Sequence, residues 1–166
     1  MARRIDREVG FAIKAAMTCA RDQGATEIGG EHLLVGIAKV PCPAAALLVE
    51  LGVDSRRLED AVGRGAHDAR LLAGLGIDLA AVQRQTGGRL HTRWRTRRPR
   101  FRVDVGKAID QSRREMRALG TRRLRVEHVL LGLLDSSVAA RELLLALDID
   151  VNELRRRLVH ALAQGG

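Results

Sequence analysis

The chain has 166 residues, of which 46% are hydrophobic, enough for one ordinary domain or for two small repeats that share a core. Aromatic residues make up only 2%, which excludes a stacking platform for single-stranded nucleic acid. The net charge of +9 permits acidic partners. No apolar run approaches the roughly 20 residues that span a bilayer, and the N-terminus does not resemble a secretory signal. We therefore expect a soluble cytoplasmic protein.

The chain carries an internal repeat with an offset of 96 residues. Residues 31–37, EHLLVGI, align without a gap with residues 127–133, EHVLLGL. Further matches at this offset join Val9-Gly10 to Val105-Gly106, Ala12-Ile13 to Ala108-Ile109, Gly24 to Gly120, Leu47-Leu48 to Leu143-Leu144, Leu51 to Leu147, Asp54 to Asp150 and Leu58 to Leu154. An ungapped match of this length indicates duplication and predicts two units related by a pseudo-twofold axis.

The first unit begins with two predicted helices. Between residues 6 and 23, apolar side chains recur at helical spacing: Val9, Ala12, Ile13, Ala16, Met17 and Ala20. Gly24 follows at the place where a left-handed glycine commonly ends a helix. A second helix is predicted to start near Glu31 and to run through Leu33, Leu34 and Ile37.

Two further helices complete the unit. Pro41 and Pro43 break the second helix and start a third, which Gly52 ends. Asp54 is predicted to cap the N-terminus of a fourth helix. The second unit repeats this order, with helices predicted over 103–119, 127–135, 138–147 and 150–163. No segment shows the alternation of a β-strand, so the sequence predicts an all-α fold.

A stretch without a counterpart lies between the two units. Its apolar residues predict one or two short helices broken by Gly74 and Gly76. Around Trp94 this pattern fails, and arginines crowd at positions 89, 93, 95, 97, 98, 100 and 102, which is typical of an exposed, mobile basic linker. We therefore expect a single domain with three parts: repeat one over 1–64, an insert and Arg-rich linker over 65–100, and repeat two over 101–164.

The two Glu-His segments, with the Leu-Gly-Val-Asp step at 51–54 and its counterpart at 147–150, resemble the Clp N-terminal domain. This domain is the double four-helix repeat at the front of Clp-type AAA+ unfoldases, and the resemblance covers most of residues 4–160. The chain has no GxxxxGK[ST] phosphate loop and no room for an ATPase domain. It is thus similar to stand-alone actinobacterial members of the family, including Gly-Ile-Asp-Leu at 76–79. The resemblance implies a non-enzymatic binding module that modulates Clp proteolysis as a decoy or adaptor.

The resemblance also implies binding residues. In related domains, glutamates at the positions of Glu31 and Glu127 hold the guanidinium of a phosphorylated arginine, and a carboxylate suits a planar guanidinium. Asp6 replaces a family threonine in repeat one and would repel phosphate. We therefore expect the better site in repeat two, with Glu127 and Arg102 as its oppositely charged poles. Adaptors and cyclic-peptide antibiotics bind the family near the starts of the first helices, where Phe101 retains the aromatic residue.

Simpler interpretations of the same residues stay open. A carboxylate in the first turn of a helix stabilises the helix dipole, which alone explains Glu31 and Glu127. The adjacent His32 and His128 point about 100° away from these glutamates, so we expect them to bond a neighbouring loop rather than to transfer protons. Phe101 is explained equally well as a core residue.

The expected partners are Clp ATPase or protease components, arginine-phosphorylated or degron-bearing proteins, and cyclic peptides. The alternative is a nucleic-acid-binding protein, because the arginines of 89–102 could neutralise several phosphates. A solvated linker explains the same run, and no helix-turn-helix signature supports the alternative. An enzyme is not supported, since no nucleophile lies beside a base. Cys19 and Cys42 lack metal-ligand spacing, so we expect buried reduced thiols, no metal and no cofactor.

Overall fold

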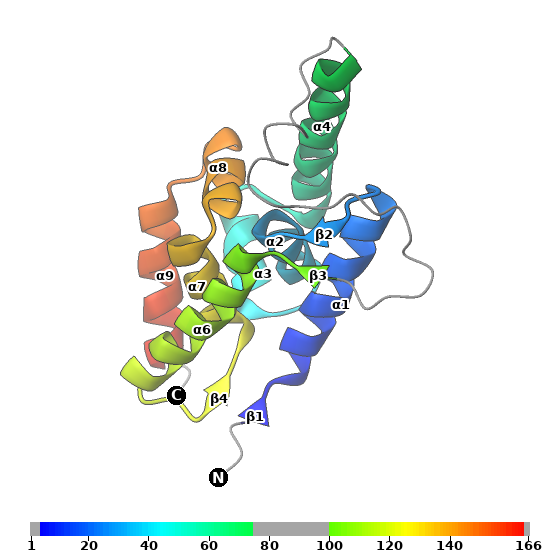
Figure 1. The fold of residues 1–166 in the computed structure, drawn as a ribbon. Helices are drawn as coiled ribbons and strands as arrows, with labels where there is room; N and C mark the ends of the chain where they lie inside the picture. The colour runs from blue at the N-terminus through cyan, green and yellow to red at the C-terminus, as the bar shows by residue number, and fades with distance from the viewer. Residues whose placement is uncertain (1–3, 75–99, 165–166) are drawn as a thin grey trace.

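Eight helices and four two-residue strands make up the described part of the chain, residues 4–74 and 100–164 of the computed structural model (Figure 1). The first unit contains β1 (Arg4–Ile5), α1 (Arg7–Asp22), β2 (Glu27–Ile28), α2 (Gly30–Ala38), α3 (Pro43–Glu50) and α4 (Ser55–Gly74). The second contains β3 (Arg100–Phe101), α6 (Val103–Ala118), β4 (Arg123–Leu124), α7 (Val126–Ser136), α8 (Val138–Ala146) and α9 (Val151–Gln164). The same elements recur in the same order, so the predicted helical duplication is confirmed.

The ends of the helices follow the capping residues in the sequence. Gly24 and Gly120 adopt left-handed conformations, with φ of 66° and 67°, directly after the first helix of each repeat. Asp54 caps α4 as predicted, because its Oδ1 accepts a hydrogen bond from the Arg57 amide at 2.8 Å. Local capping therefore fixes where the chain leaves each helix.

The strands form two parallel pairs that join the repeats to each other. β1 pairs with β4, and β2 pairs with β3 (Figure 1). Backbone hydrogen bonds extend both pairs, from the Asp6 amide to the Leu124 carbonyl at 3.0 Å and from the Arg102 amide to the Ile28 carbonyl at 2.9 Å. Each repeat thus gives its first strand to the second strand of the other. The sequence did not predict these strands, because two residues are too short to show an alternating pattern.

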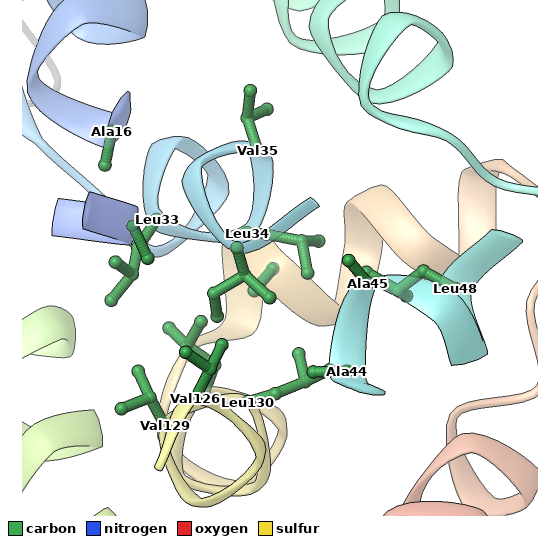
Figure 2. Packing of buried hydrophobic residues seen from close by; sticks show 14 of the residues in the cluster. Ala16, Leu33, Leu34, Val35, Ala44, Ala45, Leu48, Val126, Val129 and Leu130 are labelled. Atoms are coloured by element: carbon green, nitrogen blue, oxygen red, sulfur yellow. The ribbon is translucent and has the colours of Figure 1, made fainter. Parts of the chain in front are cut away.

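The central helices α2 and α7 face each other in the core. Leu34 of α2 lies opposite Val126 and Leu130 of α7, while Ala44 and Leu48 of α3 close the side (Figure 2). In α2 every residue from position 30 to position 37 except the glutamate is buried. A helix that is apolar on all sides has to be enclosed by others. The two repeats therefore share one core.

The glycine of each Glu-His segment, Gly36 in EHLLVG and Gly132 in EHVLLG, lets two helices approach closely. A Cβ on Gly36 would overlap the carbonyl oxygen of Ala12 in α1, and a Cβ on Gly132 would overlap that of Ala108 in α6. No larger residue fits without moving backbone. The matched glycines are thus explained by contact of α2 with α1 and of α7 with α6.

The fourth helix is longer than the sequence analysis predicted. α4 continues to Gly74, beyond the expected end of repeat one at residue 64. Gly63 and Gly65 lie within it where a Cβ would meet open space, so they weaken the helix without ending it. The remainder of the predicted insert and linker, residues 75–99, lies outside the described residues. Within the described residues no single helix is long and apolar enough to cross a membrane, although α2 and α3, bent by 94°, pass that test as a pair.

Candidate ligand-binding site

The N-terminus of α2 meets the N-terminus of α6 from the other repeat. The pairing of β2 with β3 sets the two helix starts side by side. Asp104 of α6 then accepts a hydrogen bond from the Gly30 amide of α2 at 3.2 Å. This arrangement brings Glu31 and Arg102 into contact, although 71 positions separate them.

Four side chains form a polar cluster at this junction. Arg102 donates to Glu31 Oε2 as an ion pair, and Asp104 Oδ2 lies 3.2 Å from the same guanidinium nitrogen. The Ser137 hydroxyl, which caps α8, donates to Asp104 at 2.7 Å. The side chain of Arg102 is 37% exposed and that of Glu31 is 18% exposed. We name these four residues the Glu31–Arg102 cluster; it is mostly buried, and Arg102 is its most exposed member.

The surroundings of Arg102 and Asp104 favour the charged forms of these two side chains. Burial disfavours the charge of Arg102, but Glu31 and Asp104 outweigh burial and raise its pKa above the usual range. Burial also disfavours the Asp104 carboxylate, while hydrogen bonds from Ser137 and Arg102 hold its pKa below the usual range. The Arg102 guanidinium and the Asp104 carboxylate are therefore both charged at neutral pH, and Glu31 pairs with the same guanidinium.

The two histidines cap the central helices. His32 Nδ1 accepts a hydrogen bond from the Gly29 amide at 3.0 Å, and His128 Nδ1 accepts one from the Arg125 amide at 3.1 Å. They occupy the helix position where a glutamate or glutamine commonly completes a capping box. An accepting Nδ1 requires that nitrogen to be unprotonated, and burial lowers the pKa of both rings. The prediction of a structural role for both histidines is confirmed.

Glu127 does not contact Arg102, so the structure does not bring together the two residues expected as the poles of the site in repeat two. Glu127 is 3% exposed, and the amide of Ala44 at the start of α3 bonds its carboxylate. Burial raises the pKa of this carboxyl above its usual range. The reason is the strand exchange, which sets the start of α2 next to the start of α6 from the other repeat, while each Glu-His helix otherwise packs against the first helix of its own repeat. Arg102 precedes α6 and therefore meets Glu31.

An exposed apolar rim borders the cluster. Phe101 is 43% exposed at the end of β3, so its interpretation as a core residue is wrong. Val103 is 75% exposed and Val138 is 56% exposed. In the sequence, Val103 precedes Asp104 and Val138 follows Ser137, and the Ser137 hydroxyl donates a hydrogen bond to Asp104. Apolar ligand groups can therefore reach the edge of a charged site.

The cysteines lie away from this chemistry. Cys19 and Cys42 are buried free thiols, as predicted. Burial raises the pKa of Cys19 to about 11. No group of three or more His, Cys, Asp or Glu side chains that could hold a metal occurs among residues 4–74 and 100–164.

The sequence model described as the Clp repeat N-terminal domain matches residues 4–147. This chain belongs to that family. Its 166 residues hold the paired Clp repeats and no ATPase module. No match was found among curated protein sequences. In related proteins the Clp N-domain is a non-catalytic module that binds substrates and adaptors of Clp unfoldases.

Solved structures share the Clp N-domain fold. The N-terminal domain of the chaperone ClpD from Arabidopsis thaliana has a TM-score of 0.68 at 17% identity, over 98% of this chain and 97% of that one. The Hsp104 N-terminal domain from Candida albicans has a TM-score of 0.67 at 12% identity, over 94% of this chain and 89% of that one. Identities this low establish the common fold alone.

Two members of the cluster, Asp104 and Ser137, were not among the residues predicted for the site of this Clp N-domain. The sequence held a signal for each, since Asp104 lies in the first turn of a predicted helix and Ser137 precedes another. That the two meet follows only from the packing of α6 against α7, because Ser137 directly follows α7. The sequence pattern therefore named Glu31 and Arg102 among the candidate residues, but it predicted neither their contact nor the residues that support them.

Proposed function

We propose that this chain is a non-enzymatic binding module that recognises arginine-phosphorylated polypeptides and modulates Clp proteolysis, in the cytoplasm, as a decoy or adaptor. The observation that carries the proposal is the Glu31–Arg102 cluster, in which a carboxylate already holds a guanidinium. A phosphorylated arginine carries planar N–H donors next to a phosphoryl anion. The Glu31 carboxylate can accept hydrogen bonds from these donors, and the Arg102 guanidinium can pair with the phosphoryl anion.

Binding exchanges one ion pair for two. The side chain of Arg102 turns outward and pairs with the phosphoryl group, while the N–H donors of the ligand take its place on Glu31. The exchange costs little, because Glu31 is paired with a guanidinium group both before and after the ligand binds. Asp104 stays bound to Ser137 and to the Gly30 amide, so the helix starts keep their positions. The phosphoryl group lies on the side of Arg102 away from Asp104, since the two anions repel.

The apolar rim extends the site toward polypeptide. Phe101, Val103 and Val138 are exposed and offer contact area to residues that flank the modified arginine. The same rim is the expected contact for cyclic peptides. A Phe101→Ala variant therefore weakens a peptide more than it weakens free phosphoarginine.

Calorimetric titration with free phosphoarginine tests the proposal, with arginine and phosphate as controls. We expect saturable binding at about one equivalent. Glu31→Gln and Arg102→Gln each remove a charged hydrogen-bonding partner and weaken binding about tenfold or more. Glu127→Gln is the matched control, because this carboxyl is buried at α3, and it leaves the affinity unchanged.

The contradicting results are distinct. If millimolar phosphoarginine produces no heat of binding, phosphoarginine is not the ligand. Loss of binding in Glu127→Gln but not in Glu31→Gln moves the site to the other repeat. If the chain neither slows nor speeds the degradation of an arginine-phosphorylated substrate by a Clp protease, the decoy and adaptor roles are both wrong.

A further inference from the structure

Repeat two carries a basic surface that repeat one lacks. Four exposed arginines, which we name the arginine face, lie along the second half of α6 and at the start of β4: Arg114, Arg117, Arg122 and Arg123. At the offset of 96, repeat one has Thr18, Arg21, Thr26 and Glu27 in these places. Repeat one keeps the same fold with only one of these four charges, at Arg21, so the fold does not require the other three.

The turn after α6 brings the four positions together. The Gly120 amide donates to the Arg117 carbonyl at 3.1 Å, and the Thr121 hydroxyl donates to the Met116 carbonyl at 3.2 Å. These bonds fold β4 back against the end of α6, next to β1 (Figure 1). The helix pair and the strand pair of arginines therefore flank one turn.

The arginine face is not neutralised by the protein itself. No ion pair or side-chain hydrogen bond joins any of its four residues to another described residue. By contrast, Arg21 of repeat one lies 3.5 Å from Asp22, and Arg113, next to the face, lies 3.2 Å from Asp110. Like charges gathered without counter-charges destabilise the folded state. The presence of three of these arginines in repeat two alone points to a use outside folding.

We infer that the arginine face is a second docking surface, separate from the Glu31–Arg102 cluster, which binds an acidic segment of a partner polypeptide. Guanidinium groups pair with carboxylates through two parallel hydrogen bonds, so a run of Asp and Glu complements the face. The choice of a polypeptide rests in part on the proposed function.

The surroundings of the face favour polypeptide over nucleic acid. Ile5 of β1 is 59% exposed and lies in register with Leu124, next to Arg123. An acidic segment supplies apolar side chains for such a residue, whereas a phosphate backbone supplies none. The face therefore suits acidic residues interspersed with apolar ones.

The test compares two variants of equal charge. Arg122→Gln/Arg123→Gln removes two charges from the face, and Arg56→Gln/Arg64→Gln removes two exposed charges from α4, at the other end of the molecule (Figure 1). Binding to labelled poly-L-glutamate and to random duplex DNA is measured by fluorescence anisotropy at about 0.15 M salt. We expect the face variant to weaken poly-L-glutamate binding about tenfold or more, and the α4 variant to change it less than about twofold.

Three results overturn the inference. Equal losses in both variants mean that net charge alone attracts the polymer. Tighter binding of duplex DNA, abolished in the face variant, means that the occupant is nucleic acid. If the unmodified chain does not bind poly-L-glutamate, the arginine face is not a docking surface for acidic segments. Glu31→Gln separates the two proposals, because it weakens phosphoarginine binding about tenfold or more and leaves poly-L-glutamate binding intact.

Discussion

At the scale of single residues, the two repeats place different residues at the left-handed position that follows their third helices. Gly52 follows α3 with φ of 87°, and Asp148 follows α8 at the equivalent place with φ of 62°. A left-handed conformation is strained in any residue with a Cβ. We predict that Asp148→Gly raises the free energy of unfolding by about 1 kcal/mol, as measured by urea denaturation. Gly52→Ala serves as the reciprocal control and lowers it by a similar amount; stabilisation by that substitution would refute the strain argument.

The histidine caps predict a loss of stability in acid. His32 and His128 have pKa values below the usual 6.5 in the folded chain, because burial opposes their charge. The unfolded chain therefore takes up protons first, and stability is lost as the pH falls below about 6.5. Above that pH both states are neutral at these rings and the effect vanishes. Urea midpoints measured from pH 8 to pH 5 check the prediction.

Two variants isolate the histidine effect. His32→Gln/His128→Gln keeps an acceptor at each capping position but does not titrate. This variant therefore loses less stability than the unmodified chain as the pH falls. Glu127 acts in the opposite sense, because burial raises its pKa and its protonation on acidification favours the folded chain. Glu127→Gln removes this stabilising effect of protonation, so the free energy of unfolding falls more steeply as the pH is lowered. A pH profile that the glutamine pair leaves unchanged would rule out the caps as its cause.

At the scale of helices, the close approach at the matched glycines predicts unequal effects of similar substitutions. Gly36→Ala places a Cβ against the Ala12 carbonyl oxygen and forces α1 and α2 apart. We expect a loss of about 1–3 kcal/mol in the free energy of unfolding. Gly106→Ala is the control within α6, because a Cβ there meets open space and helix propensity gives a gain of up to about 1 kcal/mol. Thermal melts followed by circular dichroism compare both; equal losses would contradict the close approach of α1 and α2.

Sequence periodicity predicted the helices well because each helix carries its own apolar stripe and caps. It could not predict ion pairs between helices, as one example shows. Lys39 joins Glu59 between α2 and α4, and Asp135 joins Arg155 between α7 and α9. The two pairs occupy equivalent positions in the two repeats, with the positive and negative residues exchanged. An alignment of the repeats by identical residues therefore detects neither pair. The contact of Arg102 with Glu31 was missed for a related reason, since contacts between the repeats depend on the strand exchange.

At the scale of the whole molecule, the strand exchange makes the repeats interdependent. β1 and β3 each complete a strand pair in the opposite repeat, and α2 and α7 bury their apolar faces against each other. Neither repeat can keep its own first strand paired when the other unfolds. The Glu31–Arg102 cluster lies at this junction, so the candidate site exists only in the assembled pair.

This interdependence predicts a single unfolding transition. Calorimetric and van't Hoff enthalpies should agree, because both repeats unfold together. Gly36→Ala in repeat one and Gly132→Ala in repeat two should each lower the same Tm without splitting the transition. Amide exchange in α2 and α7 should slow to one common rate, set by global unfolding. If Gly132→Ala instead left α2 protected while α7 exchanged, the repeats would be independent domains. The Glu31–Arg102 pair would then contribute little to holding them together.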